Sequence, residues 1–230
     1  MLHNAKILGV NLYQVSTIFI SHGHYDHAGG LIPVLTEIRK NLNLFIHPYA
    51  FYPKYKVNSK TRYVGISFKK EELRNLVNII ESRKPLRISQ DIMSSGEITR
   101  ETDFEEIPSN FYVKIDGDMI RDTVLDDIAL IIEHKRGLII ITGCGHAGII
   151  NTVLHARKIT GNDKIYAIIG GFHLINAKDN VIRKTVKHLS KLNPEIVIPL
   201  HCTGFKAVET IDQEMGEKLI LAHTGDKIVL

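Results

Sequence analysis

Cysteine is scarce in this 230-residue sequence, which contains two cysteines, Cys144 and Cys202, and no tryptophan. Two cysteines do not make a disulfide framework, so we expect a reducing, cytoplasmic compartment. Long hydrophobic runs are also lacking, because the apolar stretches at 138–141 and 196–200 are far too short to cross a bilayer. The sequence does not open on a charged-then-apolar signal. We therefore expect a soluble protein that does not associate with a membrane.

Charge of one sign is not concentrated enough to indicate a nucleic-acid-binding protein. The net charge is +4, and no recognised nucleic-acid motif accompanies it. The densest basic segment, residues 54–70, has six lysines and arginines interleaved with two tyrosines, and Tyr52 lies just before it. One interpretation is a solvated surface loop. The other is a flap that faces the substrate and favours anionic groups, with Arg62 as a substrate contact. We expect a small anionic substrate as the partner.

The order of apolar segments predicts a single α/β domain over residues 1–230. Short β-branched runs alternate with amphipathic stretches that have helical spacing. The segment at 17–46 reads as a parallel strand–helix–strand unit, residues 50–70 as a loop, and residues 128–141 as a hairpin. Helices are predicted at 4–12, 31–41, 70–81, 148–160, 181–192 and 205–215. Strands are predicted at 17–20, 44–46, 86–89, 111–113, 128–133, 137–141, 165–169, 196–200 and 227–230.

A histidine-rich loop follows the first predicted strand and reads Ser-His-Gly-His-Tyr-Asp-His-Ala-Gly-Gly over residues 21–30. In an extended loop His22 and His24 point to the same side, while Asp26 and His27 turn into the helix and face a neighbouring position. Histidines with one carboxylate suit zinc, iron or manganese. The alternative is a solvated histidine-rich loop. Four ligand-type residues within six positions after a buried strand favour a metal site.

Three further motifs each follow an apolar strand: Ile-Ile-Thr-Gly-Cys-Gly-His-Ala-Gly-Ile-Ile-Asn at 140–151, Gly-Gly-Phe-His-Leu at 170–174 and Pro-Leu-His-Cys-Thr-Gly at 199–204. With the His-x-His-x-Asp-His signature, the chain resembles the metallo-β-lactamase superfamily over nearly its whole length. It is most similar to the branch called metal-dependent hydrolases. That branch includes an archaeal synthase of methanopterin biosynthesis, which joins a dihydropterin to a ribofuranosylaminobenzene phosphate. The resemblance implies a four-layer αββα fold.

The resemblance also implies a ligand set for one or two divalent ions, with zinc favoured and iron or manganese as alternatives. His22, His24 and His146 would hold the first ion. The second would be held by Asp26, His27 and His201, and Asp26 would also help to position the attacking water.

The sequence departs from the family pattern in two places. In many relatives an aspartate after the strand at 165–169 bridges the two ions. Here that region has no carboxylate, and His173 is a candidate to ligate metal, contact substrate or orient water.

Superfamily members also usually begin with two or more strands before the histidine loop, whereas sixteen residues precede Thr17. We therefore expect the first strands to be missing and an exposed sheet edge that favours pairing with a second copy.

Other polar residues near the motifs also have candidate roles. Thr203 would bind an anionic part of the substrate through its hydroxyl. Cys144 and Cys202 are either buried thiols beneath the metal loops or thiolates near the metal. The aspartates at 122, 126 and 127 read as turn residues, one of which would accept a hydrogen bond from a ligand histidine. The histidines at 134, 155 and 188 are expected at the surface.

Three functions fit these observations. The first is a metal-dependent hydrolase that uses activated water on a small ester, lactone or phosphoester. The second is a transferase similar to the archaeal synthase. The third is a non-catalytic metal-binding protein, favoured if the missing N-terminal strands leave the site incomplete. A ribonuclease is disfavoured, because the chain has no room for a nucleic-acid-binding domain.

Overall fold

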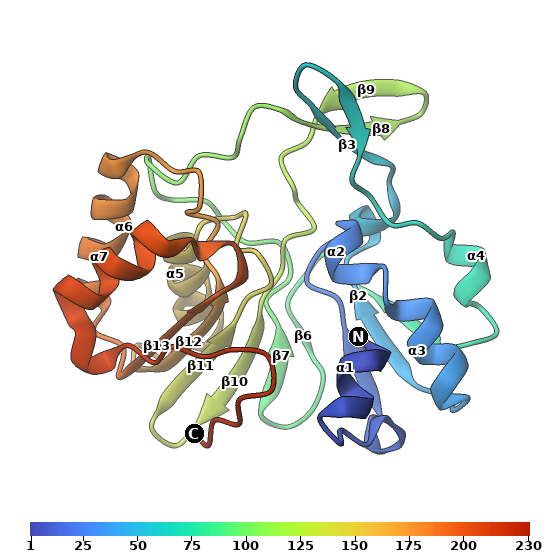
Figure 1. The fold of residues 1–230 in the computed structure, drawn as a ribbon, viewed down its shortest axis with the longest axis horizontal. Helices are drawn as coiled ribbons and strands as arrows, with labels where there is room; N and C mark the ends of the chain where they lie inside the picture. Colours follow the sequence, from blue (N-terminus) through green and yellow to red (C-terminus); the bar gives the residue numbers. More distant parts are fainter. The chain divides into compact units, whose positions relative to one another are not determined.

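In the computed structural model, which describes residues 1–230, the chain divides into two units (Figure 1). Unit 1 contains Met1–Arg83 and Pro108–Asp126, and unit 2 contains Lys84–Ile107 and Asp127–Leu230. Each unit has its own sheets and its own hydrophobic core. The organisation as one domain over 1–230 stays a prediction.

Unit 1 contains a parallel three-stranded sheet with the strand order β1-β2-β5. The strands are β1 (Thr17–Phe19), β2 (Asn43–Ile46) and β5 (Asn78–Glu81). Between β1 and β2 runs α3 (Leu31–Ile38), which buries Val34, Leu35 and Ile38 in the core of this unit. Because β1 and β2 pair in parallel, the predicted strand–helix–strand unit is confirmed. β1 is an edge strand of this sheet.

The predicted helix at 70–81 was wrong. Only α4 (Lys70–Leu73) is helical, and residues 78–81 form β5, which pairs with β2. Ile79 and Ile80 are β-branched and fit a pleated strand, and pairing with β2 satisfies their backbone groups. Leu73, Leu76 and Val77 have helical spacing for another reason. A short turn places Leu73 and Val77 in the core and packs Leu76 against it.

The predicted loop at 50–70 was also wrong, because it contains a hairpin. The hairpin strands are β3 (Lys54–Val57) and β4 (Thr61–Tyr63), and β3 pairs with β8 (Phe111–Ile115), which pairs with β9 (Asp118–Arg121). The resulting antiparallel sheet has the order β4-β3-β8-β9 (Figure 1). The Tyr55 and Tyr63 rings lie opposite each other, 5.4 Å apart between centroids. Cross-strand aromatic pairs of this kind stabilise a hairpin.

The remaining elements of unit 1 are short. The predicted helix at 4–12 is limited to α1 (Leu2–Ile7), and the histidine loop leads into α2 (Tyr25–Ala28). Two 3₁₀ turns, η1 (Leu12–Gln14) and η2 (Pro48–Phe51), complete the unit.

Unit 2 is built on a mixed six-stranded sheet with the order β13-β12-β11-β10-β7-β6. Its strands are β6 (Leu86–Arg87), β7 (Ile92–Ser94), β10 (Leu130–His134), β11 (Gly137–Ile141), β12 (Ile165–Gly171) and β13 (Ile196–Leu200). β10 and β11 form the predicted hairpin, and β11, β12 and β13 are parallel neighbours. Parallel neighbours end at the same edge of a sheet, so the loops that follow these three strands lie together.

Three helices pack beside this sheet and confirm the predicted ones within a few residues: α5 (Ile149–Thr160), α6 (Asp179–Leu192) and α7 (Phe205–Met215) (Figure 1). The 3₁₀ turns η3 (His201–Thr203) and η4 (Gly216–Lys218) flank α7. The predicted strand at 227–230 was wrong, because these residues pair with no other strand. No helix is long and apolar enough to span a membrane.

His155 does not lie at the surface as predicted. It is buried on α5, where its Nε2 lies 3.1 Å from the carbonyl oxygen of Ser95 and its Nδ1 accepts the N–H of Thr99 at 3.4 Å. A buried imidazole with both nitrogens bonded holds a segment in place. His155 therefore fastens the chain after β7 onto α5.

Candidate metal centre

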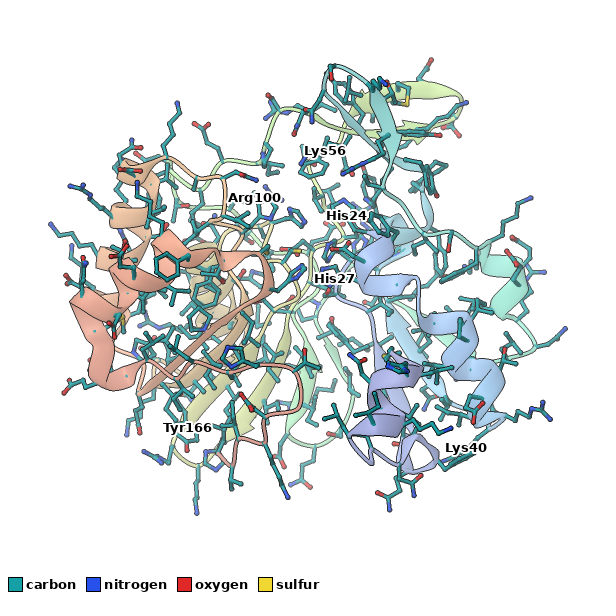
Figure 2. All side chains as sticks on the ribbon, in the orientation of Figure 1. His24, His27, Lys40, Lys56, Arg100 and Tyr166 are labelled. Atoms are coloured by element: carbon teal, nitrogen blue, oxygen red, sulfur yellow. The ribbon has the colours of Figure 1, made fainter.

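The histidine loop of unit 1 brings its ligand-type side chains together. The ring centroids of His22 and His24 are 4.7 Å apart, and those of His22 and His27 are 4.2 Å apart. Asp26 lies beside them, with its carboxylate 3.6 Å from His27 Nε2. His24 precedes α2, and His27 lies in its single turn (Figure 2). The tight turn from strand to helix thus groups three imidazoles and one carboxylate.

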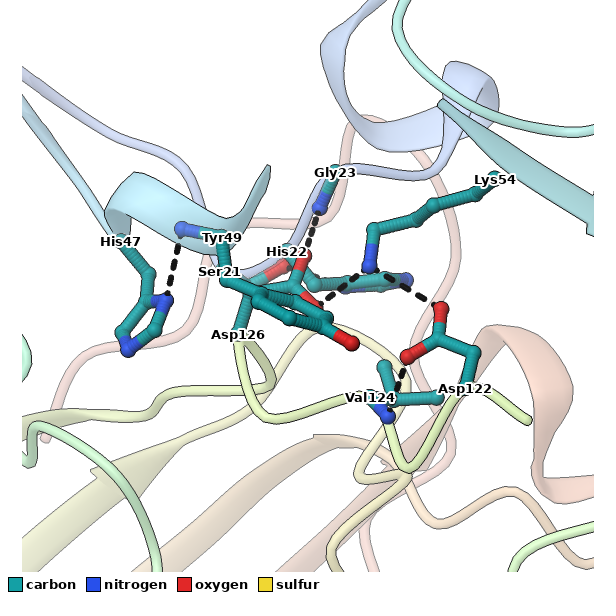
Figure 3. Close-up of polar contacts among 9 residues, drawn as sticks. All are labelled: Ser21, His22, Gly23, His47, Tyr49, Lys54, Asp122, Val124 and Asp126. Carbon is teal, nitrogen blue, oxygen red and sulfur yellow. Dashed lines mark hydrogen bonds and ion pairs between the residues drawn. The ribbon is translucent and has the colours of Figure 1, made fainter. Parts of the chain in front are cut away.

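Gly23 is the residue that lets this loop fit. A Cβ at this position would lie 2.2 Å from the carbonyl oxygen of Ala50, so only glycine is accommodated. The Gly23 N–H donates to Asp126 Oδ2 at 2.7 Å, and the Lys54 ammonium donates to Asp126 Oδ1 at 2.8 Å (Figure 3). Lys54 also donates to Asp122 at 3.1 Å. A buried lysine with two aspartates therefore anchors the backbone between His22 and His24.

This buried ion cluster sets the charge around the loop. Burial lowers the pKa of His24 to about 4; Asp126 opposes the shift and Lys54 adds to it. His24 is therefore a neutral imidazole near pH 7, which is the form that binds metal. Burial alone would raise the pKa of Asp126, but Lys54 and the Gly23 N–H hold it below its ordinary value. Asp126 thus remains a carboxylate.

In unit 2 the three remaining motifs lie after the three parallel strands. Cys144 and His146 follow β11, His173 follows β12, and His201 and Cys202 follow β13. The ring centroids of His146 and His173 are 4.1 Å apart. The Sγ atom of Cys144 lies within 4.8 Å of a ligand atom of each of His146, His173, His201 and Cys202.

The backbone at this sheet edge is unusual. His173 and His201 have φ angles of 51° and 48°, a left-handed conformation that is uncommon for residues other than glycine. His201 directly follows β13, and His173 is the second residue after β12. At both places the chain must turn sharply. Backbone strain of this kind concentrates at functional sites, because the surrounding structure must hold it in place.

Glycines allow the three loops of unit 2 to approach one another. A Cβ at Gly145 would lie 2.7 Å from the Gly171 carbonyl oxygen, and one at Gly171 would lie 2.8 Å from Cys202 Sγ. Cys202 Sγ in turn donates to the Cys144 carbonyl oxygen at 3.3 Å.

Two adjacent aspartates hold the histidine motifs, each within its own unit. Asp126 accepts the Gly23 N–H, and Asp127 accepts the Ala147 N–H next to His146 at 2.8 Å. Both are buried, so they are more than the turn residues that the sequence indicated. Asp122 does make a local turn, because its Oδ1 accepts the Val124 N–H at 2.7 Å. The expected hydrogen bond from a ligand histidine to one of these aspartates stays a prediction.

Two predicted substrate contacts have different placements. Thr203 is buried, and its hydroxyl accepts the Phe172 N–H at 3.1 Å and donates to the Leu200 carbonyl at 2.8 Å. This placement supports a role in fastening two loops together rather than a contact with substrate. Arg62 lies exposed on β4, opposite Lys56 on β3. Its role as a substrate contact stays a prediction.

The burial of Lys54 is not evident from the sequence. Its place in a basic, tyrosine-rich segment favoured a solvated loop, yet its side chain is fully buried. Its Nζ also lies 4.6 Å from the Tyr49 ring centroid. Only the two aspartates of the distant segment after β9 reveal why a lysine is buried here, and nothing in the local sequence pairs them.

The donor set fits divalent metal ions. Imidazoles with a carboxylate are the ligands that zinc and its neighbours prefer, and thiolates add to that preference. Within each unit the donors lie close together, and His24 is held in its neutral, ligand form.

The family model of the metallo-beta-lactamase superfamily matches residues 1–153. The chain therefore belongs to this superfamily and has its α/β fold, as the sequence motifs predicted. Members of the superfamily typically bind divalent metals, in agreement with the groups of histidine and cysteine described above.

The particular relatives include two proteins of Methanocaldococcus jannaschii. One is the 7,8-dihydropterin-6-methyl-4-(beta-D-ribofuranosyl)-aminobenzene-5'-phosphate synthase, 38% identical over 231 residues that cover 98% of this chain and 79% of the synthase. The other is an uncharacterized protein, 38% identical over 209 residues that cover 90% of this chain and 76% of the relative.

Two solved structures extend the comparison. The crystal structure of a metal-dependent hydrolase of the beta-lactamase superfamily matches with a TM-score of 0.86 and 30% identity, covering 100% of this chain and 84% of its own. The zinc-bound PqqB from Methylobacterium extorquens matches with a TM-score of 0.52 and 11% identity, covering 94% of this chain and 73% of its own. The second likeness concerns the fold alone.

Proposed function

We propose that this chain is a metal-dependent enzyme that transfers a group between small molecules, in the manner of the synthase relative. The observation that carries the proposal is the 38% identity to that synthase over 98% of this chain. The substrates implied by the relative's name are a 7,8-dihydropterin with a leaving group on its 6-methyl carbon and 4-(β-D-ribofuranosyl)aminobenzene 5'-phosphate. The aromatic amine would form the new carbon–nitrogen bond while the leaving group departs and the amine loses a proton.

The proposed ligand set is the one that the family resemblance implies. His22, His24 and His146 would hold one ion, and Asp26, His27 and His201 would hold the second. A divalent ion in such a site supplies Lewis-acid polarisation and activates water for attack. Zinc is the favoured ion, with iron or manganese as alternatives.

The protein's own groups would prepare the site. Lys54 and Asp126 hold the backbone between His22 and His24, which supports the placement of these two rings. His173 would contact the substrate or hold a proton at its ring nitrogen during the transfer. The exposed Arg62 on β4 would attract the phosphate of the substrate.

Hydrolysis is the second candidate, because the structure that matches with a TM-score of 0.86 is named a metal-dependent hydrolase. The same donors would then direct activated water at a small ester, lactone or phosphoester. Asp26 would hold that water, since its carboxylate lies beside the His27 ring and is partly exposed.

One experiment separates the candidates. The purified, metal-loaded protein is incubated with both synthase substrates, and separately with panels of esters, lactones and phosphoesters. Formation of the coupled product supports group transfer. Turnover of a panel substrate without any coupled product overturns the transfer proposal and supports hydrolysis. Full metal loading with no turnover in either arm overturns both and favours a non-catalytic metal-binding protein.

A further inference from the structure

Cys144 has a central place among the donors of unit 2. It is buried after β11, and its Sγ atom lies within 4.8 Å of a ring nitrogen of His146. The same sulfur lies within 4.8 Å of a ring nitrogen of His201, two strands away in the sheet. Cys144 is therefore the donor that neighbours both histidines of this unit that the proposed ligand set uses.

These spacings suit shared coordination. Zinc bonds of about 2.0–2.3 Å to nitrogen and sulfur place two tetrahedral ligand atoms roughly 3.3–3.8 Å apart. Separations of up to 4.8 Å need only a small adjustment of side chains to reach that range. Thiolate sulfur has several lone pairs and prefers zinc and related ions, so a single sulfur can bind two of them.

The loop after β12 supplies no anionic donor that would compete for this place. The strand ends with Gly170 and Gly171, and Phe172 and His173 follow it. Gly171 also leaves space for sulfur, since a Cβ there would lie 2.8 Å from Cys202 Sγ and 3.1 Å from Cys144 Cα. A larger residue here, including an aspartate, would clash with Cys202 Sγ and with the backbone of Cys144.

We propose that Cys144 provides a thiolate that bridges the two metal ions, where many relatives use an aspartate. This inference rests on the proposed function, because His146 and His201 belong there to different ions. On binding, the Cys144 thiol releases its proton to solvent and forms two sulfur–metal bonds. Cys202 has a different role: its thiol donates to the Cys144 carbonyl oxygen and fixes the Cys144 loop.

The test uses cobalt(II) as the probe metal on the full chain after removal of bound metal. The proteins are the wild type, Cys144→Ser, and Cys202→Ser as a matched control from the same cluster. Thiolate-to-cobalt charge-transfer absorption is followed as one and then two equivalents of cobalt are added. Electron paramagnetic resonance reports magnetic coupling between the two ions.

The expected result is a thiolate band that grows with both equivalents, with magnetically coupled ions, in the wild type and in Cys202→Ser. In Cys144→Ser the band and the coupling are lost, and affinity for the second ion falls by at least the roughly 10–100-fold that loss of a residue supporting a metal ligand costs. A wild type without a thiolate band overturns the proposal even if no variant folds. So does a band that persists in Cys144→Ser, or one that saturates after the first equivalent without coupling.

Failure of the metal assignment itself is recognised separately. If His146→Ala binds two equivalents of cobalt with wild-type affinity, the ligand set of the proposed function is wrong and the bridge fails with it. If His146→Ala loses cobalt while Cys144→Ser keeps the full spectrum, only the thiolate bridge is wrong.

Discussion

Lys54 and Asp126 form a fully buried ion pair, with 2.8 Å between Lys54 Nζ and Asp126 Oδ1. The other oxygen of the same carboxylate accepts the Gly23 N–H at 2.7 Å (Figure 3). A charge is stable in the interior only with a partner and hydrogen bonds, and both are supplied here. The pair therefore joins the stability of unit 1 to the geometry of the histidine loop.

Replacing Lys54 tests this coupling. Lys54→Met leaves two buried carboxylates without their cation, and we expect the free energy of unfolding to fall by about 3–5 kcal/mol. Urea denaturation measures the loss. Lys60→Met, at an exposed position in the same hairpin, is the matched control and should change stability by less than about 0.5 kcal/mol. Equal effects of the two substitutions would show that the buried pair contributes little.

Asp126 should give the protein a characteristic acid response. Because its pKa is lower in the folded protein than its ordinary value, the unfolded chain binds the proton more readily. Its contribution to stability is therefore present above the unfolded pKa of about 4 and is lost as the pH falls through the lower folded pKa. Chemical denaturation between pH 7 and pH 3 should show a shallower decline for Asp126→Asn than for the wild type. The exposed Asp118→Asn should keep the wild-type slope.

The Glu105 side chain caps the N-terminus of α5. Its two carboxylate oxygens accept the N–H groups of Ile150 and Asn151, each at 2.9 Å. These are among the N–H groups that a helix cannot satisfy internally. Glu105→Ala should lower the free energy of unfolding by about 1–2 kcal/mol, as other losses of a cap do. Thermal or urea unfolding measures this, and the exposed neighbour Glu106→Ala should have almost no effect.

Glu105 also has a pH signature opposite to that of Asp126. Burial raises its pKa, against the backbone hydrogen bonds, so the folded protein binds the proton more tightly than the unfolded chain. Its contribution is thus greatest below the unfolded pKa and declines as the pH rises through the folded pKa. Glu105→Gln should remove that decline between about pH 4 and 7. A wild-type slope in the variant would contradict the assignment.

Metal content tests the ligand set directly. His22→Ala and His146→Ala each remove one imidazole from the proposed first ion, and elemental analysis should show less metal per chain. The exposed His223→Ala serves as a control for the loss of a histidine outside the site. Unchanged metal in either ligand variant would show that the assignment is wrong.

The sequence by itself determined the family, the histidine motifs and most of the regular structure. The βαβ unit, the β10–β11 hairpin and helices α5, α6 and α7 follow from local periodicity, because each buries one apolar face. The histidine loop could be recognised because its ligand-type residues are adjacent in the chain.

Only the tertiary structure decided what depends on distant partners. Residues 78–81 form a strand because β2 offers them an edge, and residues 54–63 form a hairpin because β8 pairs with β3. Lys54 is buried because Asp122 and Asp126, some 70 residues away, neutralise it. Cys144 neighbours His173 and His201 because three parallel strands end at one sheet edge. Local sequence carries no record of such pairings, since burial of charge and convergence of loops are properties of the folded chain.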